Sequence, residues 1–126
     1  MMITGFYAGI LGLMFWGLSV NVITNRLRHK IPYGDGDVSQ LRQAIRAHGN
    51  FAEYIPMLLL MTVFVEFAGF NRGIVHALGA LAVLSRVLHY FALTKSKNRV
   101  PAMLTTFITL IAASIFAILG FFGITF

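Results

Sequence analysis

Apolar residues occur in four runs along this chain, and short polar segments separate each run from the next. Each run approaches or exceeds the roughly 20 apolar residues that a helix needs to cross a bilayer. The pattern therefore predicts an all-α fold, an integral membrane four-helix bundle that forms a single four-span transmembrane domain over residues 1–126. We expect helices over residues 5–28, 38–68, 73–94 and 100–123.

Prolines, glycines and a capping pattern mark where these helices end and begin. Pro32 ends the first helix, and the glycine- and aspartate-rich residues 33–37 form a turn. Asp37 and Gln40 have the spacing of a capping box, so the second helix begins close behind Asp37. Pro101 fits the first turn of the last helix. Four spans joined in this way place both termini on the same side of the membrane.

The composition agrees with a membrane protein and excludes some kinds of site. Hydrophobic residues make up 58% of the chain and charged residues 11%, whereas about 25% of residues are charged in soluble domains. The mean hydropathy is +0.80. The absence of cysteine excludes disulfides and thiolate nucleophiles within the chain. The four histidines have no metal-ligand spacing, so we expect no metal site.

The net charge of +6 is better explained by membrane topology than by a nucleic-acid partner. Eight of the ten basic residues lie between the first and second runs or between the third and fourth runs, and both of these segments would face the same side of the membrane. Arg72 lies on the other side, and Arg86 lies within a run. The positive-inside bias places the basic loops in the cytoplasm and the termini outward. The short loops favour a bacterial inner membrane. The clustered residues are Arg26, Arg28, Lys30, Arg42, Arg46, Lys95, Lys97 and Arg99.

No cleavable signal peptide is expected at the start of the chain. The first apolar run has no basic residue before it, and it is longer than the apolar core of a signal peptide. We therefore interpret this run as a retained transmembrane helix.

A polar stripe enters the second apolar run. Arg46, Asn50, Glu53 and Tyr54 fall on one side of a helix. A carboxylate beyond the basic end of a span is costly unless it has a partner. Glu53 lies about 10 Å inward from Arg46, and Arg86 of the third run lies about 13 Å inward from the same side. We therefore expect Glu53 and Arg86 to pair.

Two interpretations of these residues follow. In the first, the ion pair only holds two helices together. In the second, the larger polar set, which also includes His89 and Tyr90, binds a ligand that bears both carboxylates and an amine. Glu66 lies about 30 Å beyond Arg46 along the helix, so we expect it to be solvated near Arg72 at the other membrane surface.

The segment RAHGNFAEYIP (residues 46–56), followed by an apolar helix, resembles the second-helix signature of the MAPEG family (membrane-associated proteins in eicosanoid and glutathione metabolism). SRVLHYFAL (residues 85–93) resembles the third-helix element of that family. The resemblance implies a homotrimer of four-helix protomers that binds glutathione between neighbouring subunits. It also implies that lipophilic molecules are conjugated, reduced or isomerised.

The resemblance also implies roles for individual residues. A cationic arginine beside the glutathione sulfur would favour the thiolate, which is the nucleophile. The better-studied family enzymes have this arginine at the start of the fourth helix, where this chain has residues 100–104 without arginine, and Arg99 is the nearest candidate for the catalytic role. Leu93 stands where the family has a second tyrosine. The implied glutathione-binding residues are Arg26, Arg46, Asn50, Glu53, Tyr54, Arg86, His89 and Tyr90, with Arg26 reaching glutathione from the adjacent subunit.

Three hypotheses remain open from the sequence. The first is a membrane-bound glutathione-dependent transferase or peroxidase that acts on lipophilic electrophiles, with glutathione as co-substrate and no metal. The second is a non-catalytic MAPEG-like protein that binds a lipid or another ligand. The third is a small transporter in which Glu53 and Arg86 form a gating pair. All three imply the lipid bilayer as a partner, and none implies nucleic acid.

Overall fold

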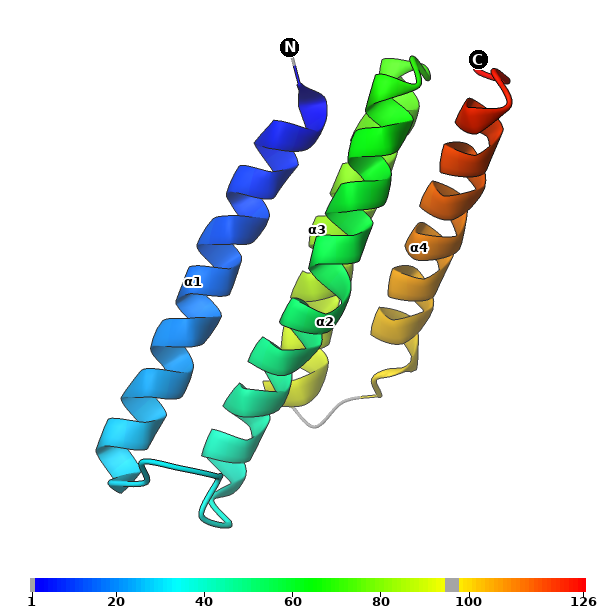
Figure 1. The fold of residues 1–126 in the computed structure, drawn as a ribbon. Helices are drawn as coiled ribbons and strands as arrows, with labels where there is room; N and C mark the ends of the chain where they lie inside the picture. Colours follow the sequence, from blue (N-terminus) through cyan, green and yellow to red (C-terminus); the bar gives the residue numbers. More distant parts are fainter. Residues whose placement is uncertain (1, 95–97) are drawn as a thin grey trace.

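The computed structural model describes residues 2–94 and 98–126 of the chain. Within these residues four helices and no strand occur: α1 (Ile3–His29), α2 (Ser39–Phe67), α3 (Arg72–Thr94) and α4 (Val100–Phe121) (Figure 1). All four are long and apolar enough to cross a membrane. The predicted all-helical fold with four membrane-length helices is therefore confirmed.

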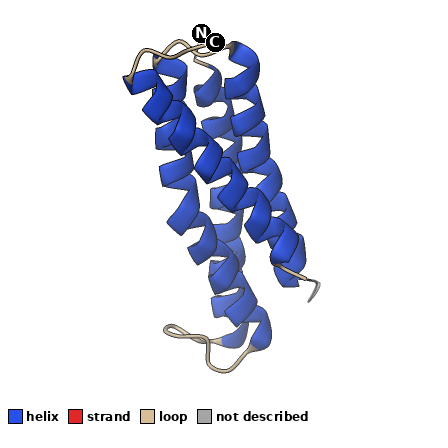
Figure 2. Ribbon diagram, turned by 90° about the vertical axis from the view of Figure 1, so that its right-hand side faces the viewer, coloured by secondary structure: helices blue, strands red, loops and turns tan. Residues whose placement is uncertain are grey.

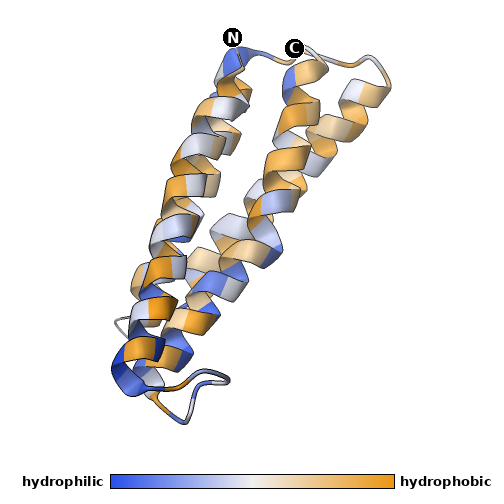
Figure 3. Ribbon diagram, turned by 60° about the vertical axis from the view of Figure 1, so that its left-hand side comes forward, coloured by the Kyte–Doolittle hydropathy of each residue, from blue (hydrophilic) through white to orange (hydrophobic). Residues whose placement is uncertain are grey.

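Helices α2 and α3 form the centre of the bundle. α1 and α4 each pack against both central helices, and in the described part of the chain they do not contact one another. The two termini lie at the same end of the bundle (Figure 2). The opposite end carries the α1–α2 connection, the end of α3 and the start of α4, and it gathers many hydrophilic residues (Figure 3). We call this opposite end the basic end.

The basic end takes its name from five arginines of the described residues. Lys95 and Lys97, which also contribute to the predicted orientation, lie outside the described residues. The orientation itself stays a prediction. The arginines are Arg26, Arg28, Arg42, Arg46 and Arg99.

The core of the bundle is apolar and divides into two clusters along its length. The cluster near the termini includes Val65 and Phe70, and the cluster nearer the basic end includes Phe51 and Leu58. Many large apolar side chains, among them Trp16 at 68% exposed, point away from the bundle. An apolar exterior is what a bilayer requires of the residues that face it, since lipid tails offer no hydrogen bonds.

Glu66 of α2 caps the first turn of α1, which corrects the prediction that it is solvated near Arg72. Its carboxylate oxygens accept hydrogen bonds from the backbone N–H groups of Ile3 (2.5 Å) and Thr4 (2.8 Å). Met2 provides no side-chain cap, so these N–H groups would otherwise lack partners. A carboxylate is also favourable at the positive end of the helix dipole.

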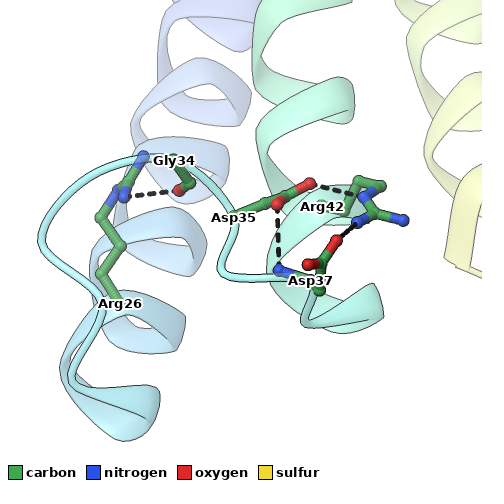
Figure 4. A network of polar contacts seen from close by, with 5 residues as sticks. All are labelled: Arg26, Gly34, Asp35, Asp37 and Arg42. Atoms are coloured by element: carbon green, nitrogen blue, oxygen red, sulfur yellow. Dashed lines mark hydrogen bonds and ion pairs between the residues drawn. The ribbon is translucent and has the colours of Figure 1, made fainter.

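The α1–α2 connection is held by two arginines (Figure 4). Arg26 donates hydrogen bonds to three loop carbonyls, the shortest to Gly34 at 2.9 Å. Arg42 forms ion pairs with Asp35 (2.5 Å) and Asp37 (2.8 Å). The hydrogen bond from Arg42 holds the pKa of Asp35 below its ordinary value. These contacts hold the loop against the ends of both helices.

The predicted capping box at Asp37 and Gln40 is wrong. The residue that precedes α2 is Val38, and no side chain caps the helix there. Asp37 instead has a positive φ of 58° and directs its carboxylate to Arg42. Because Asp37 forms an ion pair with Arg42, its carboxylate does not cap the start of α2.

We expect the variant Glu66→Ala to be less stable, because two N–H groups at the start of α1 lose their acceptor. The loss of a helix cap costs about 1–2 kcal/mol. Thermal unfolding in detergent should show a lower midpoint for Glu66→Ala than for Glu53→Ala, since Glu53 is exposed. Equal midpoints for the two variants would contradict the capping role.

The predicted membrane orientation can be tested with single cysteines, because the chain has none of its own. Tyr33 in the α1–α2 connection is 88% exposed, and Ile124 at the other end is 50% exposed. In spheroplasts, a membrane-impermeant maleimide should label Ile124→Cys directly and Tyr33→Cys only after permeabilisation. The reverse labelling order would contradict the predicted orientation.

Candidate functional site

The buried guanidinium of Arg86 on α3 connects three helices. Its Nη1 donates to the backbone carbonyl (3.2 Å) and the side-chain Oδ1 (2.6 Å) of Asn50 on α2. Its Nη2 donates to the Thr106 hydroxyl on α4, and its Nε donates to Ser85 Oγ at 3.1 Å. The Tyr54 ring centre lies 5.8 Å from the guanidinium carbon. Arg86 is thus surrounded by neutral acceptors and one aromatic ring.

The expected ion pair between Glu53 and Arg86 is not formed. Among the described residues, the recorded ion pairs are those of Arg42. Arg86 is 3% exposed, whereas Glu53 is exposed. The physical reason is that Asn50, one turn earlier on α2, places two oxygens against the guanidinium. The gating pair on which the transporter hypothesis depended is therefore missing.

A cleft lies beside this arginine, between α2, α3 and the start of α4. Its volume is about 450 Å³. We call it the α2–α4 cleft. It contains cationic, anionic and neutral polar groups together, in contrast to the apolar exterior of the bundle. The lining residues are Ile45, Arg46, Gly49, Asn50, Glu53, His89, Leu93, Arg99 and Met103.

The charged groups of the α2–α4 cleft are free to meet a ligand. Arg46, Glu53 and Arg99 are exposed and form no ion pair within the described residues. His89 is 7% exposed, and its buried Nδ1 has no hydrogen-bond partner among the described residues. A buried polar atom without a partner is uncommon in a folded protein, so a ligand that reaches His89 could supply one.

The start of α4 adds a further electrostatic feature to the cleft. Arg99 occupies the position directly before the helix and provides no side-chain cap. Asn98 accepts a hydrogen bond from the backbone N–H of Val100 at 2.9 Å. The positive end of the α4 dipole and the Arg99 guanidinium therefore lie close together, and both favour an anion.

The structure brings together five of the residues that the sequence predicted for the site: Arg46, Asn50, Glu53, His89 and Arg99. Arg86 and Tyr54 lie next to them, since Arg86 holds Asn50 and Tyr54 lies beside the guanidinium. The roles of all these residues toward glutathione stay predictions.

Tyr90 and Arg26 lie outside the α2–α4 cleft. Tyr90 is 40% exposed and lines cavities on the α1 side of α3, together with Asn21. Arg26 is engaged with the carbonyls of the α1–α2 connection of its own chain. Neither residue can contact a ligand that is confined to the α2–α4 cleft of the same chain.

Sequence reasoning missed Ser85 and Thr106, the two hydroxyl residues that hold Arg86. Both are fully buried at 0% exposed. Their hydroxyls accept from Arg86 while they donate to the carbonyls of Ala82 and Ala102, respectively. One signal in the sequence could have indicated them: both hydroxyl residues lie in apolar runs, and the third run contains the charged Arg86. A buried charge requires polar neighbours.

Comparisons of the sequence with known proteins found a family model and two relatives. A family model described as "MAPEG family" matches residues 4–119. The inner membrane protein YecN of Escherichia coli (strain K12) is 36% identical over 90 residues, which cover 71% of this chain and 69% of that protein. The protein of the same name from Escherichia coli O6:H1 matches equally. No solved structure matches the chain.

We expect Arg86→Lys to destabilise the bundle, although the charge is kept. A lysine ammonium cannot reproduce the planar fork that donates to acceptors on three helices, and unmade buried hydrogen bonds cost about 1–3 kcal/mol. The midpoint of thermal unfolding should fall for Arg86→Lys and stay unchanged for Arg99→Lys, whose guanidinium is exposed. A similar midpoint for both variants would show that Arg86 does not hold the helices together.

Proposed function

The chain belongs to the MAPEG family, and on this premise we propose that it is a membrane-bound glutathione-dependent transferase or peroxidase that acts on lipophilic electrophiles. It is a multi-pass inner membrane protein, in keeping with its four apolar helices and its similarity to YecN. In this proposal glutathione occupies the α2–α4 cleft, and the second substrate arrives from the bilayer.

The observation that carries this proposal is that Glu53, Arg46 and Arg99 line one cleft and that none of the three forms an ion pair with another described residue. Glutathione has two carboxylates, one ammonium and a thiol. The exposed guanidinium groups of Arg46 and Arg99 suit the carboxylates and the sulfur, and charge-assisted bonds of this kind are the strong ones. Glu53 suits the ammonium. Asn50, which Arg86 fixes in place, offers an amide to the peptide groups.

A neighbouring subunit would complete the site. Arg46, Glu53 and Arg99 are exposed in the single chain, and a charged ligand held there would otherwise face lipid on its outer side. In the proposed homotrimer, the adjacent protomer covers this side and keeps the ligand between two subunits. The open face of the cleft toward the basic end then remains the entrance for a water-soluble peptide.

The proposed chemistry is the activation of the glutathione thiol. A free thiol has a pKa of about 8.5, and neighbouring cations and helix N-termini lower it. Arg99 and the start of α4 provide both at the α2–α4 cleft. The thiolate attacks the electrophilic carbon of the lipophilic substrate, the sulfur–carbon bond forms, and the leaving group departs with the bonding electrons. The thiol proton passes to solvent.

A second candidate function is ligand binding without chemistry. Arg99 lies before α4 rather than within it, and it is exposed and makes no side-chain hydrogen bond to the described residues that would fix its position toward a sulfur. Leu93 provides no hydroxyl in the cleft. These two features favour a MAPEG protein that holds a ligand and does not activate it.

The proposal predicts that Glu53→Gln weakens glutathione binding by about tenfold or more, since a charge-assisted hydrogen bond to the ammonium is lost. Calorimetric titration of the detergent-purified protein measures this change. Asp37→Asn is the matched control, because it also replaces a carboxylate by an amide but lies in the α1–α2 connection. Equal affinities of Glu53→Gln and the wild type would contradict the proposed site.

Turnover decides between the two candidate functions. If the protein is an enzyme, the wild type consumes glutathione in the presence of a chromogenic electrophile or a hydroperoxide, and Arg99→Gln binds glutathione but requires a higher pH for the same rate. Glutathione binding without turnover across a panel of such substrates would select the non-catalytic function.

A further inference from the structure

A second cleft lies on the other side of the α2–α3 pair, against α1. It consists of a polar cavity of about 270 Å³ and an apolar cavity of about 400 Å³. Asn21 and Tyr90 line both cavities, so the two meet at these residues. We call the combined space the α1–α3 groove. It shares no lining residue with the α2–α4 cleft.

The polar cavity lies near the basic end and the apolar cavity lies deeper in the span, in the same order as the headgroup and the acyl chains of a membrane lipid. The polar cavity reaches Arg28 and Gln40 at the basic end, and the apolar cavity reaches Met14 deeper in the span. Arg28 and Met14 are separated by about 21 Å along α1. One leaflet of a bilayer of about 40–45 Å, headgroups included, has almost the same thickness.

The polar cavity selects an anionic group. Arg28 is exposed and has no ion pair among the described residues. Gln40 and Gln43 add amide donors around it, whereas Asn25 Nδ2 already donates to Asn21. None of the described residues that line the groove carries a carboxylate, so an ammonium group would find no counter-charge. This differs from the α2–α4 cleft, which contains Glu53.

The apolar cavity suits a hydrocarbon chain. Met14, Leu18, Phe51 and Val87 form most of its walls. The side chain of Arg86 also lines it, with its guanidinium bonded to Asn50 and Thr106. Gly17 leaves space on the α1 side, since an added Cβ there would meet no other atom within 4 Å. A chain that enters from the polar cavity passes Tyr90, which presents an apolar ring and a hydroxyl at the level where the two cavities meet.

We propose that the α1–α3 groove is a binding site for one anionic phospholipid of the leaflet at the basic end. The phosphate is held by the Arg28 guanidinium and by the amide side chains of Gln40 and Gln43. One acyl chain lies in the cavity beside Gly17. This inference does not depend on the proposed reaction with glutathione, because the two sites share no lining residue.

The test is native mass spectrometry of the detergent-purified protein with phosphatidylglycerol, with phosphatidylcholine of the same acyl chains, or with glycerol phosphate alone. We expect one strongly retained phosphatidylglycerol per chain, weaker retention of phosphatidylcholine and no retained glycerol phosphate. Arg28→Gln should weaken phosphatidylglycerol binding about tenfold through loss of a charge-assisted contact. Gly17→Leu should abolish retention because it fills the apolar cavity.

Matched controls separate this site from general lipid association. Lys30→Gln removes the same charge two residues from Arg28, outside the groove, and Gly9→Leu adds the same side chain at an exposed α1 glycine that also has open space. Neither control should change retention. Equal effects of Arg28→Gln and Lys30→Gln, retention by Gly17→Leu, or equal binding of phosphatidylcholine would overturn the proposal. A change of oligomer size in Gly17→Leu alone would also overturn it, because a second copy would then cover the groove.

Discussion

A guanidinium buried inside a membrane protein must find hydrogen-bond acceptors, since lipid offers none and an unpartnered charge there is costly. Arg86 meets this requirement with neutral oxygens from three helices: the amide and carbonyl of Asn50, and the hydroxyls of Ser85 and Thr106. Helices α2, α3 and α4 must therefore approach one another at one level. The α2–α4 cleft and the α1–α3 groove lie on either side of this point.

Because Arg86 is bound by neutral acceptors, the α2–α4 cleft keeps a carboxylate beside its arginines. If Glu53 neutralised Arg86, the cleft would lose its only carboxylate among the described residues and could recognise anions alone. Because Asn50 takes the guanidinium, Glu53 remains free beside Arg46 and Arg99. A buried cation thus supports an exposed site of mixed charge, which is the kind of site that a zwitterionic peptide requires.

The sequence predicted the helices well because their lengths follow from bilayer thickness and their ends follow from prolines and polar segments. Depth along each helix follows from the constant rise per residue, and Arg86 does reach Asn50 and Tyr54 of α2. Rotation about the helix axis was harder to predict. His89 and Tyr90 have almost the same depth, yet consecutive residues of a helix point about 100° apart. His89 lines the α2–α4 cleft and Tyr90 lines the α1–α3 groove, and both also line a small cavity between these two spaces. Glu53 and Arg86 likewise share a depth without sharing a contact.

Contacts between residues far apart in sequence were the other source of error. Glu66 caps a helix that begins 63 residues earlier, and no local pattern indicates such a partner. Arg26 was expected at the glutathione site only because of the family resemblance. In the structure its guanidinium donates to the carbonyls of its own loop, and its role toward a neighbouring subunit stays a prediction. Arg28, two residues later, keeps its charge free and faces the α1–α3 groove. Arg26 is thus bound to the loop, whereas Arg28 on the same turn of α1 is available to bind an anionic molecule.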